Sequence, residues 1–140
     1  MSTQEHPNLS GEWILNREAC TLSPGADGVV SGVWRIDHRE PVFRHKATFA
    51  TAGDPIQFEY ELRSDTPDTV SGQGGATTRS SLKWEGDALV VSMQISHAHG
   101  EMSIVFRHEL TDGGQRLRAS EQLRGTDHDQ DNVWVFDRRS

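Results

Sequence analysis

Apolar and polar residues alternate along most of this chain, in short runs separated by turn residues. The clearest run is 56–63, in which Ile56, Phe58, Tyr60 and Leu62 alternate with polar or charged residues. A period of two residues is typical of a β-strand with one buried and one solvated face. Comparable runs predict further strands near 11–16, 29–38, 42–51, 69–73, 77–84, 89–97, 102–110, 116–124 and 132–138. In the run 29–38 the shared parity of Val30, Trp34, Ile36 and His38 predicts that all four point inward.

Turn sequences such as Glu85-Gly86-Asp87 and Asp112-Gly113-Gly114 join successive runs, and no segment shows a convincing helical period. Short connections between neighbouring strands favour an up-and-down order, and closing that order removes edge strands. We therefore predict an all-β fold, an antiparallel up-and-down β-barrel of eight to ten strands with an internal cavity. Residues 1–8 are predicted to be a flexible N-terminal tail, and residues 9–140 a single barrel domain.

The composition limits the kinds of binding partner but adds little to the prediction of the fold. The chain of 140 residues has a formal net charge of −7, which argues against nucleic acid or an anionic membrane as its main partner. A single cysteine, Cys20, excludes an intrachain disulfide, and the polar start at 1–9 has no apolar signal-peptide core. We expect a cytoplasmic location. The sequence leaves open whether the protein is a monomer or a homodimer.

The stretch Leu9-Ser10-Gly11-Glu12-Trp13 resembles the Gly-x-Trp opening of the calycin group, which includes lipocalins and fatty-acid-binding proteins. The segments "WEGDALVV", "ELTDGGQRL" and "VWVFDRR" also look like those of small bacterial lipocalin-like proteins of unassigned role. The resemblance implies that Trp13 lies across a closed barrel floor, with Arg138 or Arg139 packed over it. It also implies a ligand cavity at the opposite end, without naming a ligand.

The inward parity carries many aromatic side chains, which predicts a pocket for an apolar or aromatic small molecule. Several histidines, Tyr60 and Glu121 share that parity and add polar groups to the wall. We expect the ligand to contact residues from most strands: Trp34, His38, Phe43, His45, Phe58, Tyr60, Trp84, Met93, His97, Phe106, His108, Glu121 and Trp134.

Glu121 lies between Ala119 and Leu123 on the inward parity, and burying a carboxylate costs several kcal/mol unless it is paired. One interpretation is structural: Glu121 pairs with a neighbouring histidine or arginine inside the barrel, or lies at the solvated mouth of the barrel. The alternative is catalytic. A cofactor-independent cyclase or isomerase would use His45, Tyr60, His108 and Glu121 as acid–base groups around a folded substrate.

A cupin-like metal enzyme is the third hypothesis. The segments 97–101 and 125–132 resemble the two cupin motifs, but the acid after the His-x-His pair comes too early and the Pro-x-Gly is missing. We therefore assign no metal ligands and expect no cofactor. The ordering of hypotheses is a small-molecule-binding barrel first, a cyclase or isomerase second, and a cupin-like enzyme third.

Overall fold

The computed structural model describes residues 7–24, 26–66, 68–73, 75–98, 100–125 and 129–139. They form ten antiparallel strands and two short 3₁₀ helices, neither of which could span a membrane. The elements are β1 (Gly11–Leu15), η1 (Arg17–Ala19), β2 (Val29–Arg39), β3 (Val42–Thr51), β4 (Ile56–Arg63), β5 (Thr69–Gln73), β6 (Ala76–Glu85), β7 (Ala88–His97), β8 (Gly100–Thr111), η2 (Asp112–Gly114), β9 (Arg116–Arg124) and β10 (Asp129–Arg138). The predicted tail at 1–8 lies largely outside the described residues.

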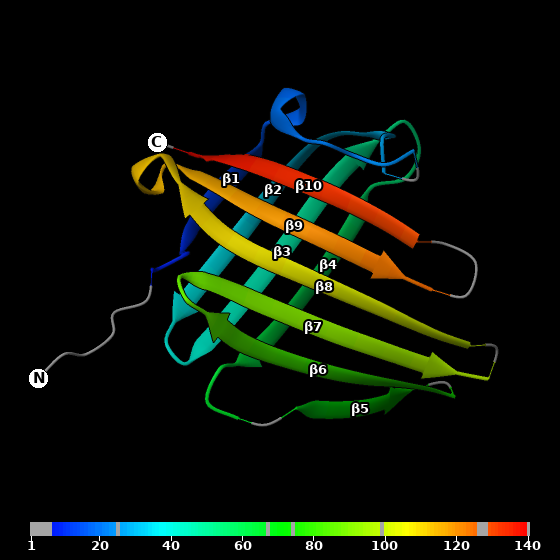
Figure 1. The fold of residues 1–140 in the computed structure, drawn as a ribbon. Coiled ribbons are helices and arrows are strands. Elements are labelled where there is room, and N and C mark those ends of the chain that lie inside the picture. Colours follow the sequence, from blue (N-terminus) through cyan, green and yellow to red (C-terminus); the bar gives the residue numbers. More distant parts are fainter. Residues whose placement is uncertain are drawn as a thin grey trace, which may run out of the picture.

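The strands form one curled sheet in the order β4-β3-β2-β1-β10-β9-β8-β7-β6-β5. Within the described residues, β1 pairs with β10 and every other ladder joins strands that follow one another in sequence. The predicted all-β up-and-down architecture is therefore confirmed. Figure 1 shows two walls that cross each other, with β1 to β4 in one wall and β6 to β10 in the other.

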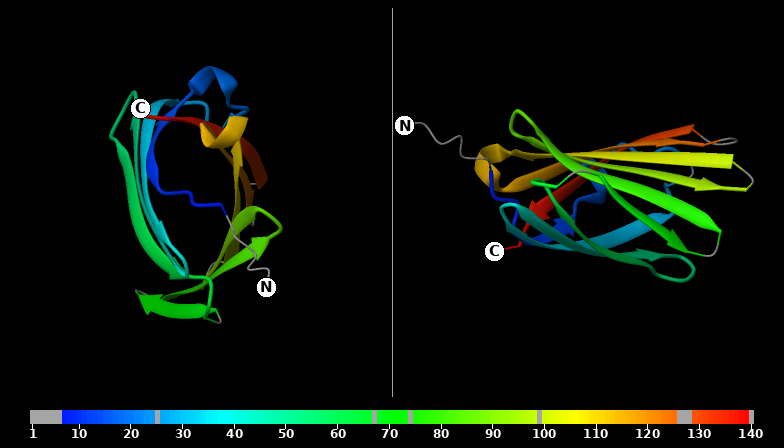
Figure 2. Two further views of the ribbon diagram at one scale, coloured as in Figure 1. Left: turned by 90° about the vertical axis from the view of Figure 1, so that its left-hand side faces the viewer. Right: turned by 90° about the horizontal axis from the view of Figure 1, so that it is seen from below.

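Hydrogen bonding does not close the sheet completely, because β4 and β5 are its two ends. We call the gap between them the seam. β4 approaches β6 across the seam, and the end-on view in Figure 2 shows the two walls meeting there. β5 has few apolar side chains to turn inward, and Val70 is 56% exposed, so little apolar burial draws this strand onto β4.

The floor of the barrel is formed by Trp13, which is fully buried. The guanidinium carbon of Arg138 lies 4.2 Å from the centroid of the Trp13 ring, a cation–π contact. The indole Nε1 of Trp13 donates to the carbonyl of Leu9 at 3.0 Å, and Arg138 Nη1 donates to the carbonyl of Ser10 at 2.9 Å. The partner of Trp13 is thus Arg138, and Arg139 instead pairs with Glu12.

Gly11 is required by this floor. Its φ is +148°, and a Cβ added there would lie 2.6 Å from Nη1 of Arg138. The guanidinium cannot move aside without cost, because Arg138 also donates from Nε to the carbonyl of Gly114 at 3.0 Å.

We expect Gly11→Ala to lower the free energy of unfolding by about 1–3 kcal/mol, through backbone strain and displacement of Arg138. Urea denaturation measures the change. Gly28→Ala is the matched control, because a Cβ at Gly28 meets nothing within 4 Å. A Gly11→Ala protein as stable as its parent would show that the floor does not depend on this close approach.

A buried aromatic cluster separates the floor from the other end of the barrel. The rings of Trp34 and Phe136 have centroids 4.2 Å apart, and those of Trp34 and His45 are 4.4 Å apart. Phe43 packs between His45 and His108, with ring centroids 5.8 and 5.6 Å away. Each of these five side chains is at most 1% exposed, and burial of each large aromatic group contributes about 1.5–3 kcal/mol.

One inward assignment in β2 is wrong. Val30 is 61% exposed, whereas Val29 is buried and faces the interior. The cause is an irregularity in the β2–β3 ladder between Val29 and Ser31, since a β-bulge adds a residue and reverses the parity before it. The predicted inward positions after the bulge, Trp34 and His38 among them, are confirmed as buried.

Candidate ligand-binding cavity

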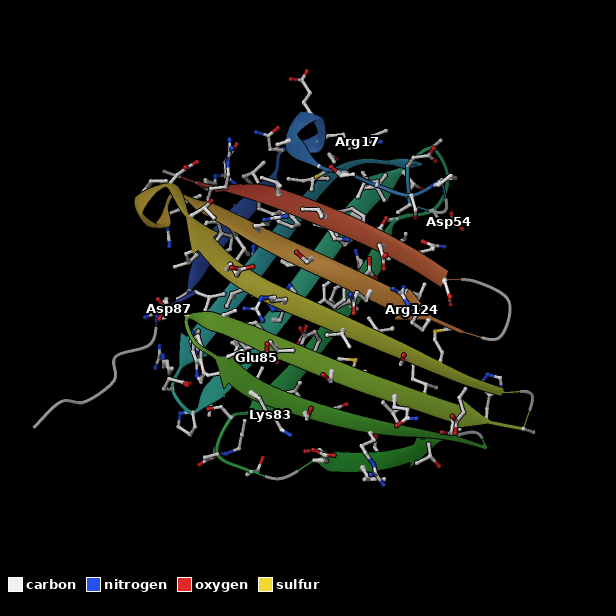
Figure 3. All side chains as sticks on the ribbon, viewed as in Figure 1. Arg17, Asp54, Lys83, Glu85, Asp87 and Arg124 are labelled. Atoms are coloured by element: carbon white, nitrogen blue, oxygen red, sulfur yellow. The ribbon has the colours of Figure 1, made fainter. Side chains whose placement is uncertain are left out.

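A cavity of about 220 Å³ lies at the end of the barrel opposite Trp13. Figure 3 labels Asp54 and Arg124 at this end of the molecule and Asp87 at the floor end. The cavity is lined by the connection before β2 and by residues of strands β2, β3, β4, β8, β9 and β10: Ala26, Val29, Trp34, Phe49, Ile56, Phe58, Phe106, Glu121, Gln130, Asn132 and Trp134.

Five aromatic side chains from five strands contribute to this lining: Trp34, Phe49, Phe58, Phe106 and Trp134. Phe49 lies centrally, with ring centroids 5.1 Å from Trp134, 6.2 Å from Trp34 and 6.4 Å from Phe58. Phe106 completes the set from β8, at 6.2 Å from Trp34. Such spacing between rings allows favourable edge and tilted contacts, and it presents flat apolar surfaces to a bound molecule.

Glu121 introduces a carboxylate into this apolar wall. Its Oε1 accepts hydrogen bonds from Asn132 Nδ2 at 3.0 Å and from Trp134 Nε1 at 2.9 Å. Asn132 is only 3% exposed, and its Oδ1 accepts from the backbone N–H of Ser23 at 2.7 Å. In the described part of the chain the hydrogen-bond partners of Glu121 are therefore an amide and an indole from β10 rather than a histidine or arginine, and Glu121 itself is half-buried at the cavity.

β10 begins at Asp129, three residues earlier than predicted, and this extension brings Gln130 into the cavity wall. The added residues are polar, so hydrophobic alternation gives no signal for them. Their strand conformation is supported instead by pairing with β9 and by Arg124, whose Nη1 donates to Asp131 at 2.7 Å and to the carbonyl of Gln130 at 3.2 Å. Ser23 Oγ also donates to Gln130 Oε1 at 3.1 Å.

His45, Tyr60 and His108 lie outside the cavity lining, on the side of the aromatic cluster. The Tyr60 hydroxyl is 2.9 Å from His45 Nδ1, and His108 Nδ1 donates to the carbonyl of Leu89 at 3.0 Å. Burial lowers the pKa of His108 to about 4, and burial together with the charge of His108 lowers the pKa of His45 well below its ordinary value. Burial also raises the pKa of Tyr60. Of the four acid–base candidates, Glu121 is the one that lines the cavity.

His38, Phe43 and Trp84 lie towards the floor. His38 Nδ1 accepts from the backbone N–H of Leu9 at 3.1 Å, and its Nε2 is 3.2 Å from Glu40 Oε2. Trp84 Nε1 donates to Glu40 Oε1 at 2.5 Å, and the Phe43 ring lies 5.7 Å from His38. These contacts hold the N-terminal segment and the β2–β3 turn onto the barrel end.

Met93 and His97 are both on β7 and neither lines the cavity. Met93 is half-buried against the core, whereas His97 keeps the same parity along the regular β7–β8 ladder and is exposed at the end of the strand. Buried and exposed positions no longer alternate near the end of β7. Ile95 and Ser96 are both half-buried there, because neither face of the strand is fully covered.

The described residues contain no group of three or more His, Cys, Asp or Glu side chains placed to hold a metal ion. The cupin-like interpretation involved segments 97–101 and 125–132. Of these, His99 and residues 126–128 lie outside the described residues.

A curled ten-stranded meander, with β1 joined to β10 and a cavity opposite a Trp–Arg floor, defines a calycin-like β-barrel. The sequence prediction of this fold is confirmed.

No protein-family model and no curated protein matches the chain. Several solved structures, however, match the fold of this chain. An SAHS protein from Ramazzottius varieornatus superposes with a TM-score of 0.66 at 9% identity, over 99% of this chain and 100% of that one. The REP1-NXSQ fatty acid transporter gives 0.59 at 14% identity, over 94% and 96%. Rv2717c from M. tuberculosis gives 0.54 at 17% identity, over 94% and 93%. At these identities the likeness establishes the fold alone.

Proposed function

We propose that the protein reversibly binds a small apolar or aromatic molecule in the cavity at the Glu121 end of the barrel. The observation that carries the proposal is the cavity of about 220 Å³ with five aromatic side chains in its wall. An apolar protein cavity of about 150 Å³ can hold benzene, so this one has room for a single small ring system with a short substituent. One protein with this fold is named a fatty acid transporter, which supports a binding role.

Binding is favoured over turnover by the position of the acid–base groups. His45, Tyr60 and His108 lie outside the cavity lining, and two of them are hydrogen-bonded to each other. Glu121 is fixed by two donors from β10, as expected of a group that orients a ligand. A cyclase or isomerase would need a second acid or base on the lining.

Filling the cavity tests the proposal. Ala26 lines it from the connection before β2, where a larger side chain need not displace a strand. We expect Ala26→Trp to weaken binding of the neutral probe 2-phenylethanol by at least about tenfold, because the indole occupies the ligand volume. Ligand-observed NMR titration measures affinity, and native mass spectrometry of the purified protein reports any retained ligand.

Ala50→Trp provides the matched control, since Ala50 is exposed on β3 and a tryptophan there leaves the cavity unchanged. Circular dichroism establishes that both variants are folded. If Ala26→Trp binds 2-phenylethanol as tightly as the parent does, the cavity is not the ligand site.

A further inference from the structure

The cavity wall contains a carboxylate as well as apolar side chains. Among the lining residues that the structure describes, Glu121 is the only one with an ionisable side chain. Both of its described hydrogen bonds end on Oε1, so Oε2 accepts none from the described part of the chain. A carboxylate beside apolar surface is stabilised by a positively charged or hydrogen-donating partner, and the free oxygen offers a place for one.

The aromatic rings around Glu121 favour the same kind of partner. Trp134 donates its Nε1 to the carboxylate, which places this indole edge directly beside the charge. Phe49 lies 5.1 Å from Trp134, and Trp34, Phe58 and Phe106 complete the wall. Aromatic faces attract cations within about 6 Å, and most strongly where water is excluded. A carboxylate among five aromatic side chains therefore suits an organic ammonium group.

The charged residues around the cavity entrance also favour a positively charged ligand. Of the arginines towards this end of the barrel, Arg124 pairs with Asp131, whereas Arg17 donates to the carbonyls of Val29 and Asp27 and keeps its positive charge. The chain as a whole carries a net charge of −7. Such a field raises the local concentration of cations and lowers that of anions. Exposed carboxylates in the connections and at the strand end beside the cavity include Asp27 before β2, Asp54 before β4, and Asp129 and Asp131 at the start of β10.

We infer that the cavity selects small organic cations, namely amines on an aromatic or cyclic apolar body, over neutral and anionic molecules of the same shape. This inference rests on the proposed binding function and deepens it. The ammonium group would lie against Glu121 Oε2, and the apolar body would lie between Phe49, Phe58 and Phe106. A carboxylate ligand would meet Glu121 with no cation among the described lining residues to compensate for it.

Three probes of one shape test the selection: the cation 2-phenylethylamine, the neutral 2-phenylethanol and the anion 3-phenylpropionate. We expect the parent to bind the amine roughly tenfold to a hundredfold more tightly than the alcohol, and to bind the anion most weakly, because charge-assisted hydrogen bonds exceed neutral ones by that order. Glu121→Gln should abolish the preference for the amine over the alcohol, since the amide oxygen can still accept from Asn132 and Trp134 but carries no charge.

Glu59→Gln is the matched control. Glu59 is exposed on β4, so this change removes the same charge outside the cavity, and the preference for the amine should persist. Equal affinity of the parent for the amine and the alcohol would overturn the inference while leaving the binding function intact, and this comparison does not depend on any variant folding. A preference that survives in folded Glu121→Gln would also overturn it. If none of the three probes binds the parent, the proposed function itself fails.

Discussion

Replacing Trp13 by alanine is expected to lower the free energy of unfolding by about 3–5 kcal/mol, the cost of a large buried aromatic side chain in a packed core. Trp13 is fully buried, and removing its indole also leaves the guanidinium of Arg138 without the ring beneath it. The carbonyl of Leu9 loses its donor as well. Urea denaturation followed by circular dichroism measures the change.

Trp84→Ala is a fitting comparison, because Trp84 is a half-buried tryptophan at the same end of the barrel and its loss should cost less. The folded fraction of Trp13→Ala should bind 2-phenylethanol with parental affinity, since the floor and the cavity occupy opposite ends of the barrel. A loss of affinity as large as that of Ala26→Trp would show that the two ends do not act separately.

Acidification from about pH 7.5 to pH 5 is expected to destabilise the protein by about 2 kcal/mol through His108, with a further loss in the same direction through His45. Both histidines are buried and neutral in the folded state. The pKa of His108 falls to about 4 and that of His45 lies well below its ordinary value, whereas in the unfolded chain both titrate near about 6.5. Below about pH 6.5 the unfolded chain therefore binds protons that the folded protein does not. The stability present above that pH is lost as the pH falls towards about 4.

Denaturation curves across this range, which ends before most carboxylates titrate, give the dependence. His108→Asn keeps an amide donor near Nδ1 for the carbonyl of Leu89, and it should reduce the slope of unfolding free energy against pH. His97→Asn is the matched control, because it makes the same substitution at an exposed position. A parent protein with no loss of stability between pH 7.5 and pH 5 would contradict the placement of neutral histidines in the core.

The sequence identified which face of each strand turns inward, but not the height of a residue along the barrel. Parity placed His38, His45 and His108 inside, and all three are buried. His38 lies at the floor, His45 and His108 lie in the middle, and Glu121 lies at the cavity. The height of a residue along the barrel depends on the stagger between strands, and the parity of a position carries no information about that stagger. The Trp13 floor could be predicted because the Gly-x-Trp opening resembles that of the calycin group, which implies a tryptophan across the floor and an arginine from the last strand over it.

The cavity residues that were missed have separate physical reasons. Val29 was hidden by the bulge that reverses parity near the start of β2. Gln130 and Asn132 belong to a strand whose first residues are polar, so that backbone pairing and Arg124 hold them in place without hydrophobic alternation. Trp34, Phe58, Phe106, Glu121 and Trp134 were predicted to contact a ligand and do line the cavity, because each is on an inward position in the upper half of the barrel.

The seam between β4 and β5 determines how this barrel can change its width. Widening it at any described ladder breaks backbone hydrogen bonds, each with a net contribution of about 0.5–1.5 kcal/mol. At the seam the walls are in contact without a described ladder, so they can separate there with the loss of side-chain contacts, among them the hydrogen bond from Trp84 Nε1 to Glu40 Oε1. Phe58 and Ile56 of the cavity wall belong to β4, the strand that borders the seam. The cavity is therefore adjacent to the least constrained boundary of the sheet, where its volume can adjust to a guest while the floor at Trp13 stays fixed.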